Sequence, residues 1–172
     1  MNVQNITKRA WIFVLALLVA CFSVSLCGCT PADAPGEEAS RTAALTLPYR
    51  TVQIGIGDAA KVVLEQLGED YTVQEAASCA GIGKDYVYTY PSLRLYVFAP
   101  EQGEAVISSA CYTDDGAAIN GITIGSSADA AVAALGKPTE QTESKLAYRA
   151  TDAVLTLSLR DGRVSAIVLS EN

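Results

Sequence analysis

Histidine is absent from all 172 residues of the chain. Histidine titrates nearest to neutral pH and is a frequent metal ligand, so its absence excludes Ser-His-Asp triads and histidine metal sites. Basic residues are also scarce, with 12 Lys and Arg against 19 Asp and Glu, which gives a formal net charge of −7. An acidic chain binds nucleic acid and anionic lipid head groups poorly. We therefore expect no nucleic-acid partner.

The chain also lacks a recognisable arrangement of catalytic or metal-binding residues. Glu37-Glu38, Glu69-Asp70 and Asp114-Asp115 stand in linker or turn contexts, where solvated surface acids are expected. No acidic loop has the alternating ligand spacing of a dedicated calcium site. Cys79 and Cys111 have neither Cys-x-x-Cys spacing nor a histidine partner. We predict that the protein is not an enzyme and has no catalytic residue, no cofactor and no metal site.

The amino terminus has the pattern of an export signal. Lys8 and Arg9 directly precede residues 11–26, an uncharged run of apolar and small side chains. This run is close to the lower length limit for a membrane-spanning helix, about 17 residues, so a retained anchor is an alternative. The residues that follow favour cleavage.

Leu26-Cys27-Gly28-Cys29 resembles the bacterial lipobox. The resemblance implies that residues 1–28 are a signal peptide and that Cys29 is lipidated, which predicts an extracytoplasmic protein held on a bacterial membrane by its lipid. Removal of residues 1–28 takes away Lys8 and Arg9 but no acid, so the formal net charge changes from −7 to −9.

The mature chain divides into a tether and one domain. Residues 29–44 hold the lipidated Cys29 and then a stretch of Pro, Ala, acidic and small polar residues, which cannot bury enough surface to fold. Residues 45–172 have the size of one ordinary domain. Because Cys21 and Cys27 leave with the signal, only Cys79 and Cys111 remain to form a disulfide. The alternative is two buried free thiols.

Two stretches of this domain resemble each other at an offset of 68 residues. Ile54-Gly55-Ile56-Gly57 aligns with Ile122-Thr123-Ile124-Gly125, and the alignment continues to Gly68 and Gly136. Such self-similarity is typical of an internal repeat. We predict repeat one at about residues 50–112 and repeat two at about residues 118–170.

A short helix is predicted in each copy. Apolar residues recur at helical spacing at 60, 63, 64 and 67, and again at 128, 131, 132 and 135. Asp58 and Ser126 stand where N-caps are expected, and Gly68 and Gly136 stand where helices stop.

The first copy also contains G-x-G-x-x-A, which is close to a dinucleotide-binding fingerprint. Its first glycine, Gly55, is Thr123 in the second copy. A phosphate loop needs that glycine for its tight turn, together with a following β-α-β unit that this sequence lacks. We therefore interpret the motif as a strand-to-helix junction.

Short apolar segments separated by Pro, Gly and Asp predict strands after each helix. The predicted strands cover residues 86–90, 93–98 and 105–111, and then 145–150, 154–159 and 164–169. Asp161-Gly162 is a strong hairpin signal. The predicted fold is α+β, with two tandem helix-plus-three-stranded-meander repeats that form an antiparallel sheet with both helices packed on one face.

The second copy carries I-T-I-G at residues 122–125, A-L-G-K-P at residues 134–138, Tyr148, and D-G-R-V-S-A-I at residues 161–167. This pattern resembles the repeats of small bacterial envelope lipoproteins related to the SmpA/OmlA fold and to the beta-lactamase-inhibitor-protein fold. The resemblance covers most of residues 50–172 and implies a fold rather than a function. The first copy departs from it, because Glu69-Asp70 replaces Lys-Pro and an insertion contains Cys79.

The remaining functional signal is aromatic. Tyrosines alternate in the stretch around residue 88, and an arginine, a tyrosine and a phenylalanine alternate on the next predicted strand; the candidate binding surface is Tyr86, Tyr88, Tyr90, Arg94, Tyr96 and Phe98. Tyrosine is enriched in recognition surfaces. Alternation does not tell which side is buried, so the rings are either exposed or part of the core.

These features predict a non-enzymatic, membrane-anchored lipoprotein that binds another protein of the cell envelope. Two alternatives are a module that binds a small molecule or cell-wall glycan, and a structural spacer.

Overall fold

The computed structural model describes residues 45–78 and 82–172. They belong to one compact unit, Ser40–Asn172. The predicted signal peptide, the lipobox with Cys29, the tether and Cys79 lie outside the described residues.

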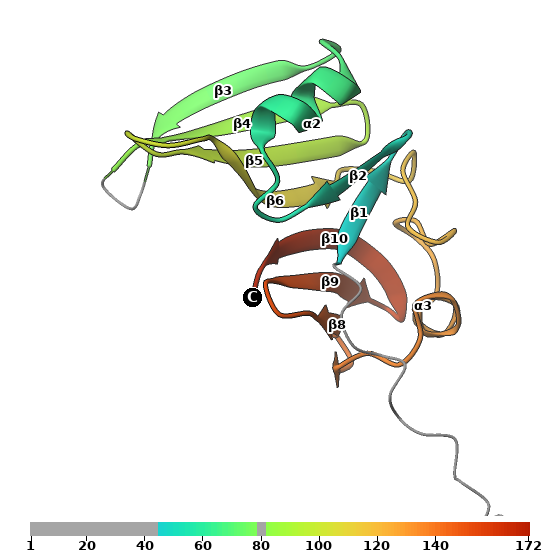
Figure 1. Cartoon of the computed structure of the whole chain (residues 1–172). Coiled ribbons are helices and arrows are strands. Elements are labelled where there is room, and N and C mark those ends of the chain that lie inside the picture. Colours follow the sequence, from blue (N-terminus) through green and yellow to red (C-terminus); the bar gives the residue numbers. More distant parts are fainter. Residues whose placement is uncertain (1–44, 79–81) are drawn as a thin grey trace, which may run out of the picture. The chain divides into compact units, whose positions relative to one another are not determined.

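Eight strands form one antiparallel sheet in the order β3-β4-β5-β6-β10-β9-β8-β7 (Figure 1). The strands are β3 (Thr72–Ala77), β4 (Lys84–Tyr90), β5 (Leu93–Ala99), β6 (Val106–Tyr112), β7 (Glu140–Gln141), β8 (Lys145–Arg149), β9 (Ala153–Arg160) and β10 (Arg163–Glu171). Strands that follow one another in the sequence are neighbours in the sheet, except that β6 lies beside β10. The sheet therefore consists of two meanders joined in its middle.

The join between the meanders, which we call the seam, is the antiparallel pair β6–β10. Its register runs from Ser109 opposite Ser170 to Tyr112 opposite Ile167. Ile167 and its neighbour Leu169 have no exposed surface. The seam thus lies at the centre of the core rather than at its margin.

Turn residues predicted from the sequence explain the hairpins. Asp161 and Gly162, which connect β9 to β10, have φ values of 52° and 70°. Positive φ at both central residues is the requirement of a type I′ turn, whose twist matches that of the flanking strands. This confirms the hairpin predicted at Asp161-Gly162.

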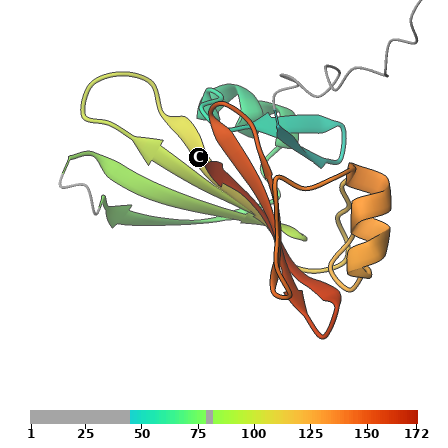
Figure 2. The same cartoon turned by 90° about the horizontal axis from the view of Figure 1, so that it is seen from below.

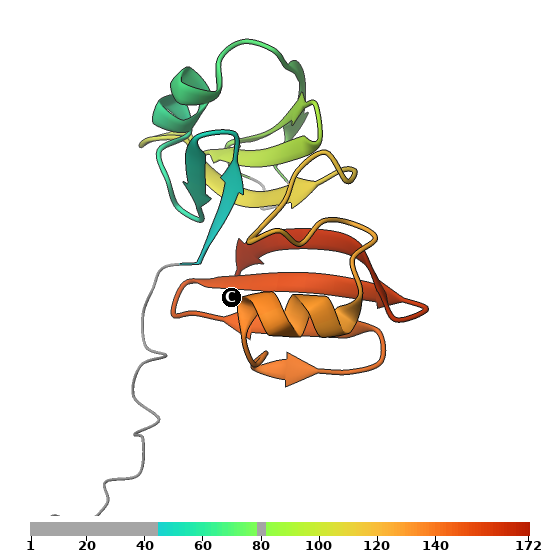
Figure 3. The same cartoon turned by 90° about the vertical axis from the view of Figure 1, so that its right-hand side faces the viewer.

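A second, two-stranded sheet precedes the large one and was not predicted as such. It consists of β1 (Thr46–Tyr49) and β2 (Val52–Gly55), connected by a turn in which Arg50 has a φ of 54°. The hairpin buries Leu47 and Ile54 completely. It lies between the two helices in all three views (Figures 1, 2 and 3).

The two helices of the described chain, α2 (Ala60–Leu67) and α3 (Ala128–Leu135), form where the apolar spacing predicted them. Each ends at a glycine, Gly68 or Gly136, with φ near 80° and ψ near 180°. Only glycine adopts this backbone conformation without strain. The predicted helix stops are therefore confirmed.

The predicted N-caps were wrong by one residue. The N-cap positions are Ala59, which makes no capping bond, and Ser127, whose hydroxyl accepts from the N–H of Ala130. Asp58 and Ser126 instead accept from backbone N–H groups three residues earlier, at 2.7 and 3.1 Å. Both side chains therefore stabilise the turn before the helix. They do not cap the first N–H groups of the helix.

The predicted α+β architecture of two helix-plus-three-stranded-meander repeats with helices packed on the sheet is wrong. The fold is mostly sheet, with 50% strand and 13% helix. Helix α2 lies mainly against β2 of the hairpin, and α3 buries only Ala131. Short helices with few large apolar residues cannot cover eight strands, so the hairpin supplies much of the cover.

The core combines one face of the large sheet with the hairpin and the inner sides of the helices. The large side chains with no exposed surface come mainly from strands on both sides of the seam: Leu47, Ile54, Leu93, Leu95, Ile107, Leu146, Leu157, Ile167 and Leu169. One continuous cluster therefore extends from the first meander to the second.

Candidate functional site

The register of β4 and β5 assigns the predicted aromatic residues to opposite faces of the sheet. Tyr86, Tyr88 and Tyr90 lie opposite Val97, Leu95 and Leu93. Directly opposed residues of an antiparallel pair share a face, and these β5 partners belong to the core. The three tyrosines therefore lie on the core face. Of the two alternatives predicted for these rings, the one that places them in the core is confirmed for all three.

The three tyrosines form a cluster on that face and differ in how deeply they are buried. Tyr90 is only 2% exposed, whereas Tyr86 and Tyr88 are half-buried. Tyr71 packs edge-on against Tyr88, with ring centroids 5.0 Å apart, and lies 5.3 Å from Tyr90. Burial raises the pKa of Tyr90 to about 12. These rings serve packing more than recognition.

The other predicted residues lie on the opposite face, which we call the open face. Arg94, Tyr96 and Phe98 alternate with the core residues of β5, and no strand or helix of residues 45–78 and 82–172 contributes core residues on their side. The register adds neighbours from the adjoining strands: Asp85, Val87, Thr89, Val106, Ser109, Cys111, Thr156, Val168 and Ser170. The open face is thus made mainly of small, hydroxyl-bearing and β-branched residues, with two aromatic rings and Asp85 near one end.

Arg94 is the charged residue nearest the middle of the open face. Its cross-strand neighbours are the uncharged Thr89 and Cys111, and within the described part of the chain it forms no ion pair. Interaction with the Tyr96 hydroxyl raises the pKa of Arg94. The site therefore presents an uncompensated positive charge beside Tyr96 and Phe98, on a protein that is acidic as a whole.

The β8 end of the open face is charged but internally neutralised. Glu140 lies 2.7 Å from Lys145 and 3.7 Å from Arg149. The hydrogen bond from Lys145 lowers the pKa of Glu140. These long side chains surround Ala147, which is 1% exposed although it points away from the core. This end is less accessible than the β5 end.

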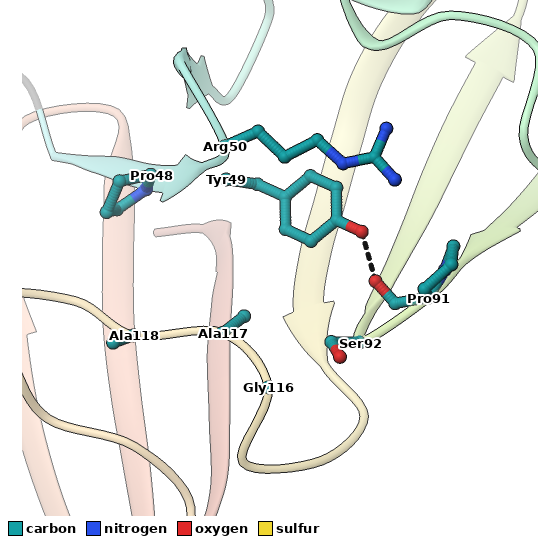
Figure 4. A pocket seen from close by; sticks show the side chains of 8 residues that line it. All are labelled: Pro48, Tyr49, Arg50, Pro91, Ser92, Gly116, Ala117 and Ala118. Carbon is teal, nitrogen blue, oxygen red and sulfur yellow. Dashed lines mark hydrogen bonds between the residues drawn. The ribbon is translucent and has the colours of Figure 1, made fainter.

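The pockets of the described chain have few polar groups available to bind a small ligand. One of about 440 Å³ is lined by Pro48, Tyr49, Arg50, Pro91, Ser92, Gly116, Ala117 and Ala118 (Figure 4). Its best polar groups are already engaged: the Tyr49 hydroxyl donates to the Pro91 carbonyl, and Arg50 lies 3.4 Å from Asp70. Another pocket, of about 490 Å³, is lined partly by Leu45, Leu135, Tyr148 and Leu155. Both are open to solvent.

The G-x-G-x-x-A motif has no N–H groups free for a phosphate at its key positions. The N–H of Gly57 donates to Ile107 O and that of Ala60 donates to Ala105 O, each at 2.8 Å. Helix N-termini bind anions through such N–H groups when they have no other acceptor. At this junction they bond instead to Ala105 and Ile107, where β6 begins.

Cys111 is half-buried on the open face and forms no disulfide with a described residue. Burial raises its pKa, and the nearby Arg94 opposes this effect. Since Cys79 lies outside the described residues, the predicted disulfide stays a prediction. Within residues 45–78 and 82–172, no group of three His, Cys, Asp or Glu side chains could hold a metal ion, and no helix is long and apolar enough to cross a membrane.

Comparisons of the chain with protein-family models, with curated proteins and with solved structures find no match. The resemblance to SmpA/OmlA-like lipoproteins therefore stays a prediction.

Sequence reasoning did not recognise that the open face extends across the seam to β10 and β9. The only available signal was the alternation of Ser and Thr with Leu in residues 153–160. That alternation reveals a two-sided strand but not its neighbour in the sheet.

Proposed function

We propose that the chain is a non-enzymatic lipoprotein, anchored through Cys29, whose domain binds another protein of the cell envelope through the open face. The observation that carries the proposal is an eight-stranded sheet with a core on one face and, on the other, Arg94, Tyr96 and Phe98 on a single strand. Aromatic residues and arginine are the residue types that most often dominate binding energy at interfaces.

The chemistry of the site suggests what the partner presents. Arg94 has no acidic neighbour across β4 or β6, so a carboxylate of the partner would gain a charge-assisted hydrogen bond there. Tyr96 and Phe98, two positions apart, would pack against apolar side chains beside that carboxylate. A broad sheet face suits a protein surface better than a small ligand, which needs an enclosing pocket.

The two alternatives have less support. The polar groups of the pocket near Tyr49 are engaged within the chain, so a small molecule would have to displace those contacts. A spacer without a ligand requires neither an uncompensated arginine nor adjacent aromatic rings.

Photocrosslinking from the full chain in its native membrane tests the proposal. A photoreactive residue replaces Tyr96 on the open face, and a matched control replaces Val62, which is on α2 and 50% exposed. We expect one partner protein to be captured from Tyr96 and not from Val62. An Arg94→Glu substitution should lower that capture at least about tenfold, the usual effect of reversing a charge at an interface hot spot.

Two results would contradict this function. One is equal capture from both positions, which indicates non-specific proximity. The other is no capture from Tyr96 although the protein is folded and membrane-bound.

A further inference from the structure

The two edges of the large sheet differ in how they are protected. At one edge, β7 has only two residues, follows Pro138 in the sequence, and carries Glu140 in ion pairs with Lys145 and Arg149. Short edge strands, proline and charged side chains are the usual means by which proteins prevent edge-to-edge association. This edge therefore cannot readily accept another strand.

The opposite edge, β3, lacks the short length and the proline that protect β7, and it carries a single charge. All six of its residues, Thr72–Ala77, are exposed, and in the described part of the chain no strand pairs with its outer side. It contains no proline, no lysine and no bulge against β4. Its one charged residue, Glu75, lies 2.6 Å from Lys84 of β4. The charge is thereby drawn toward the sheet rather than toward the open edge.

The backbone of β3 is correctly oriented to accept a strand. Hydrogen-bonded pairs alternate along an antiparallel ladder, and the bond from Ser78 N–H to Gly83 O fixes that alternation for β3 and β4. Even-numbered residues of β3 therefore bond to β4. Val73 and Glu75 direct their N–H and C=O groups outward, and the Val73 side chain is 50% exposed.

We propose that β3 is a self-association edge, at which a second copy of this chain adds its own β3 in antiparallel orientation. A two-fold axis perpendicular to the sheet relates the copies, as is usual for homodimers. The result is one continuous sheet across both copies. This inference is independent of the proposed function, because it uses the edge of the sheet and not the open face.

The sequence of β3 is complementary to itself in one register. With the axis at Gln74, Gln74 lies opposite Gln74 of the second copy, Val73 lies opposite Glu75, and Thr72 lies opposite Ala76. Val73 and Glu75, whose backbone groups point outward, then form the hydrogen-bonded pairs. Moving the axis to Glu75 would place two carboxylates opposite each other, which destabilises a strand pair. Of the two registers that pair five residues of β3 with each other, centred on Gln74 or on Glu75, charge therefore selects the one centred on Gln74.

The dimer is expected to be weak. A pair of six-residue strands buries less than the roughly 1,200 Å² that specific stable interfaces need. Association should therefore depend on protein concentration, and it would be promoted where many copies share one surface.

A charge-swap experiment at Gln74 tests both the interface and its register. Full chains carrying Gln74→Lys or Gln74→Glu are purified in detergent, and their mass is followed against concentration by analytical ultracentrifugation. Each variant alone should dimerise about five to ten times more weakly than the unsubstituted chain, because like charges oppose each other. An equimolar mixture of the two variants should dimerise at least as well as the unsubstituted chain.

The matched control uses Gln141 on the opposite edge strand. Gln141→Lys and Gln141→Glu add the same charges and should leave dimerisation unchanged. The proposal is overturned if the unsubstituted chain stays monomeric at millimolar concentration, if the Gln74 variants dimerise normally, or if mixing them restores nothing.

Discussion

At the scale of single residues, two tyrosine hydroxyls bond to the ends of the two helices in the same way. The Tyr90 hydroxyl of β4 donates to Gly68 O at 3.1 Å, and the Tyr148 hydroxyl of β8 donates to Gly136 O at 3.2 Å. A helix leaves its last carbonyls without intrahelical partners, so each tyrosine satisfies one of them from a strand. These hydroxyls connect each helix terminus to its half of the sheet.

Replacement of Tyr90 by Phe should change both stability and its dependence on pH. Loss of the hydrogen bond should cost about 1 kcal/mol at pH 7. The pKa of Tyr90 in the folded protein is about 12, above the ordinary tyrosine pKa of 10.0. Its contribution to stability is therefore fully present below pH 10 and is lost as the pH rises toward 12. The variant should lose less stability over that interval.

Urea unfolding at pH 7, 9, 10.5 and 11.5 measures this effect, with Tyr71→Phe as a control within the same ring cluster. Burial also raises the pKa values of Tyr88, Tyr112 and Tyr148, so alkaline destabilisation should be reduced in Tyr90→Phe but not abolished. An unchanged slope above pH 10 would contradict the assignment.

At the scale of elements, the hairpin β1–β2 contributes more to the core than α3 does. Leu47, Tyr49, Val52 and Ile54 of the hairpin are all buried, whereas Ala131 is the one buried residue of α3. The Tyr112 hydroxyl of β6 also donates to Pro48 O of the hairpin. The hairpin therefore supplies more of the buried apolar cover of the large sheet than α3 does.

A leucine-to-alanine substitution, made once in the hairpin and once in α3, tests which of the two elements contributes more to the core. Leu47→Ala removes a side chain with no exposed surface and should lower the free energy of unfolding by about 2–5 kcal/mol. Leu135→Ala in α3 removes a partly exposed leucine and should cost clearly less. Equal losses in urea unfolding would assign α3 an importance comparable to that of the hairpin.

Elements that carry a local sequence signal were predictable, and elements without such a signal were not. One turn and two helix ends were predictable because they need backbone conformations that few residues adopt. The residues that indicate them are Asp161-Gly162, Gly68 and Gly136. The turn at Arg50 has equally unusual dihedrals, but neither it nor Thr51 is a typical turn residue, so the hairpin was missed. The register of the strands decides which face of the sheet Tyr88 and Tyr96 occupy. An alternating sequence pattern does not contain that register.

At the scale of the whole molecule, the seam makes one cooperative unit of two meanders. The buried cluster continues from Leu95 through Ile167 to Leu157 without interruption. Because the two meanders pair through their edge strands β6 and β10, neither meander can lose its structure without exposing an edge of the other. We expect the described domain to unfold as a whole.

Ile167→Ala at the seam tests this cooperativity. The substitution should cost about 2–5 kcal/mol, as for other fully buried large apolar residues. Hydrogen exchange measured by mass spectrometry should show protection falling by the same factor in β4–β5 and in β8–β9. Loss of protection in the second meander alone would show that the halves are stabilised separately.

The seam also has a consequence for the order in which the polypeptide is made. The tenth strand in the sequence, β10, occupies a central position in the sheet. A ribosome that has released the chain as far as β9 has therefore made both flanks of the sheet but not the strand that unites them. Until β10 emerges, β6 and β9 each present an unpaired side to the surroundings. A chaperone that shields these two strands would protect the nascent chain during the interval in which it is most prone to aggregate.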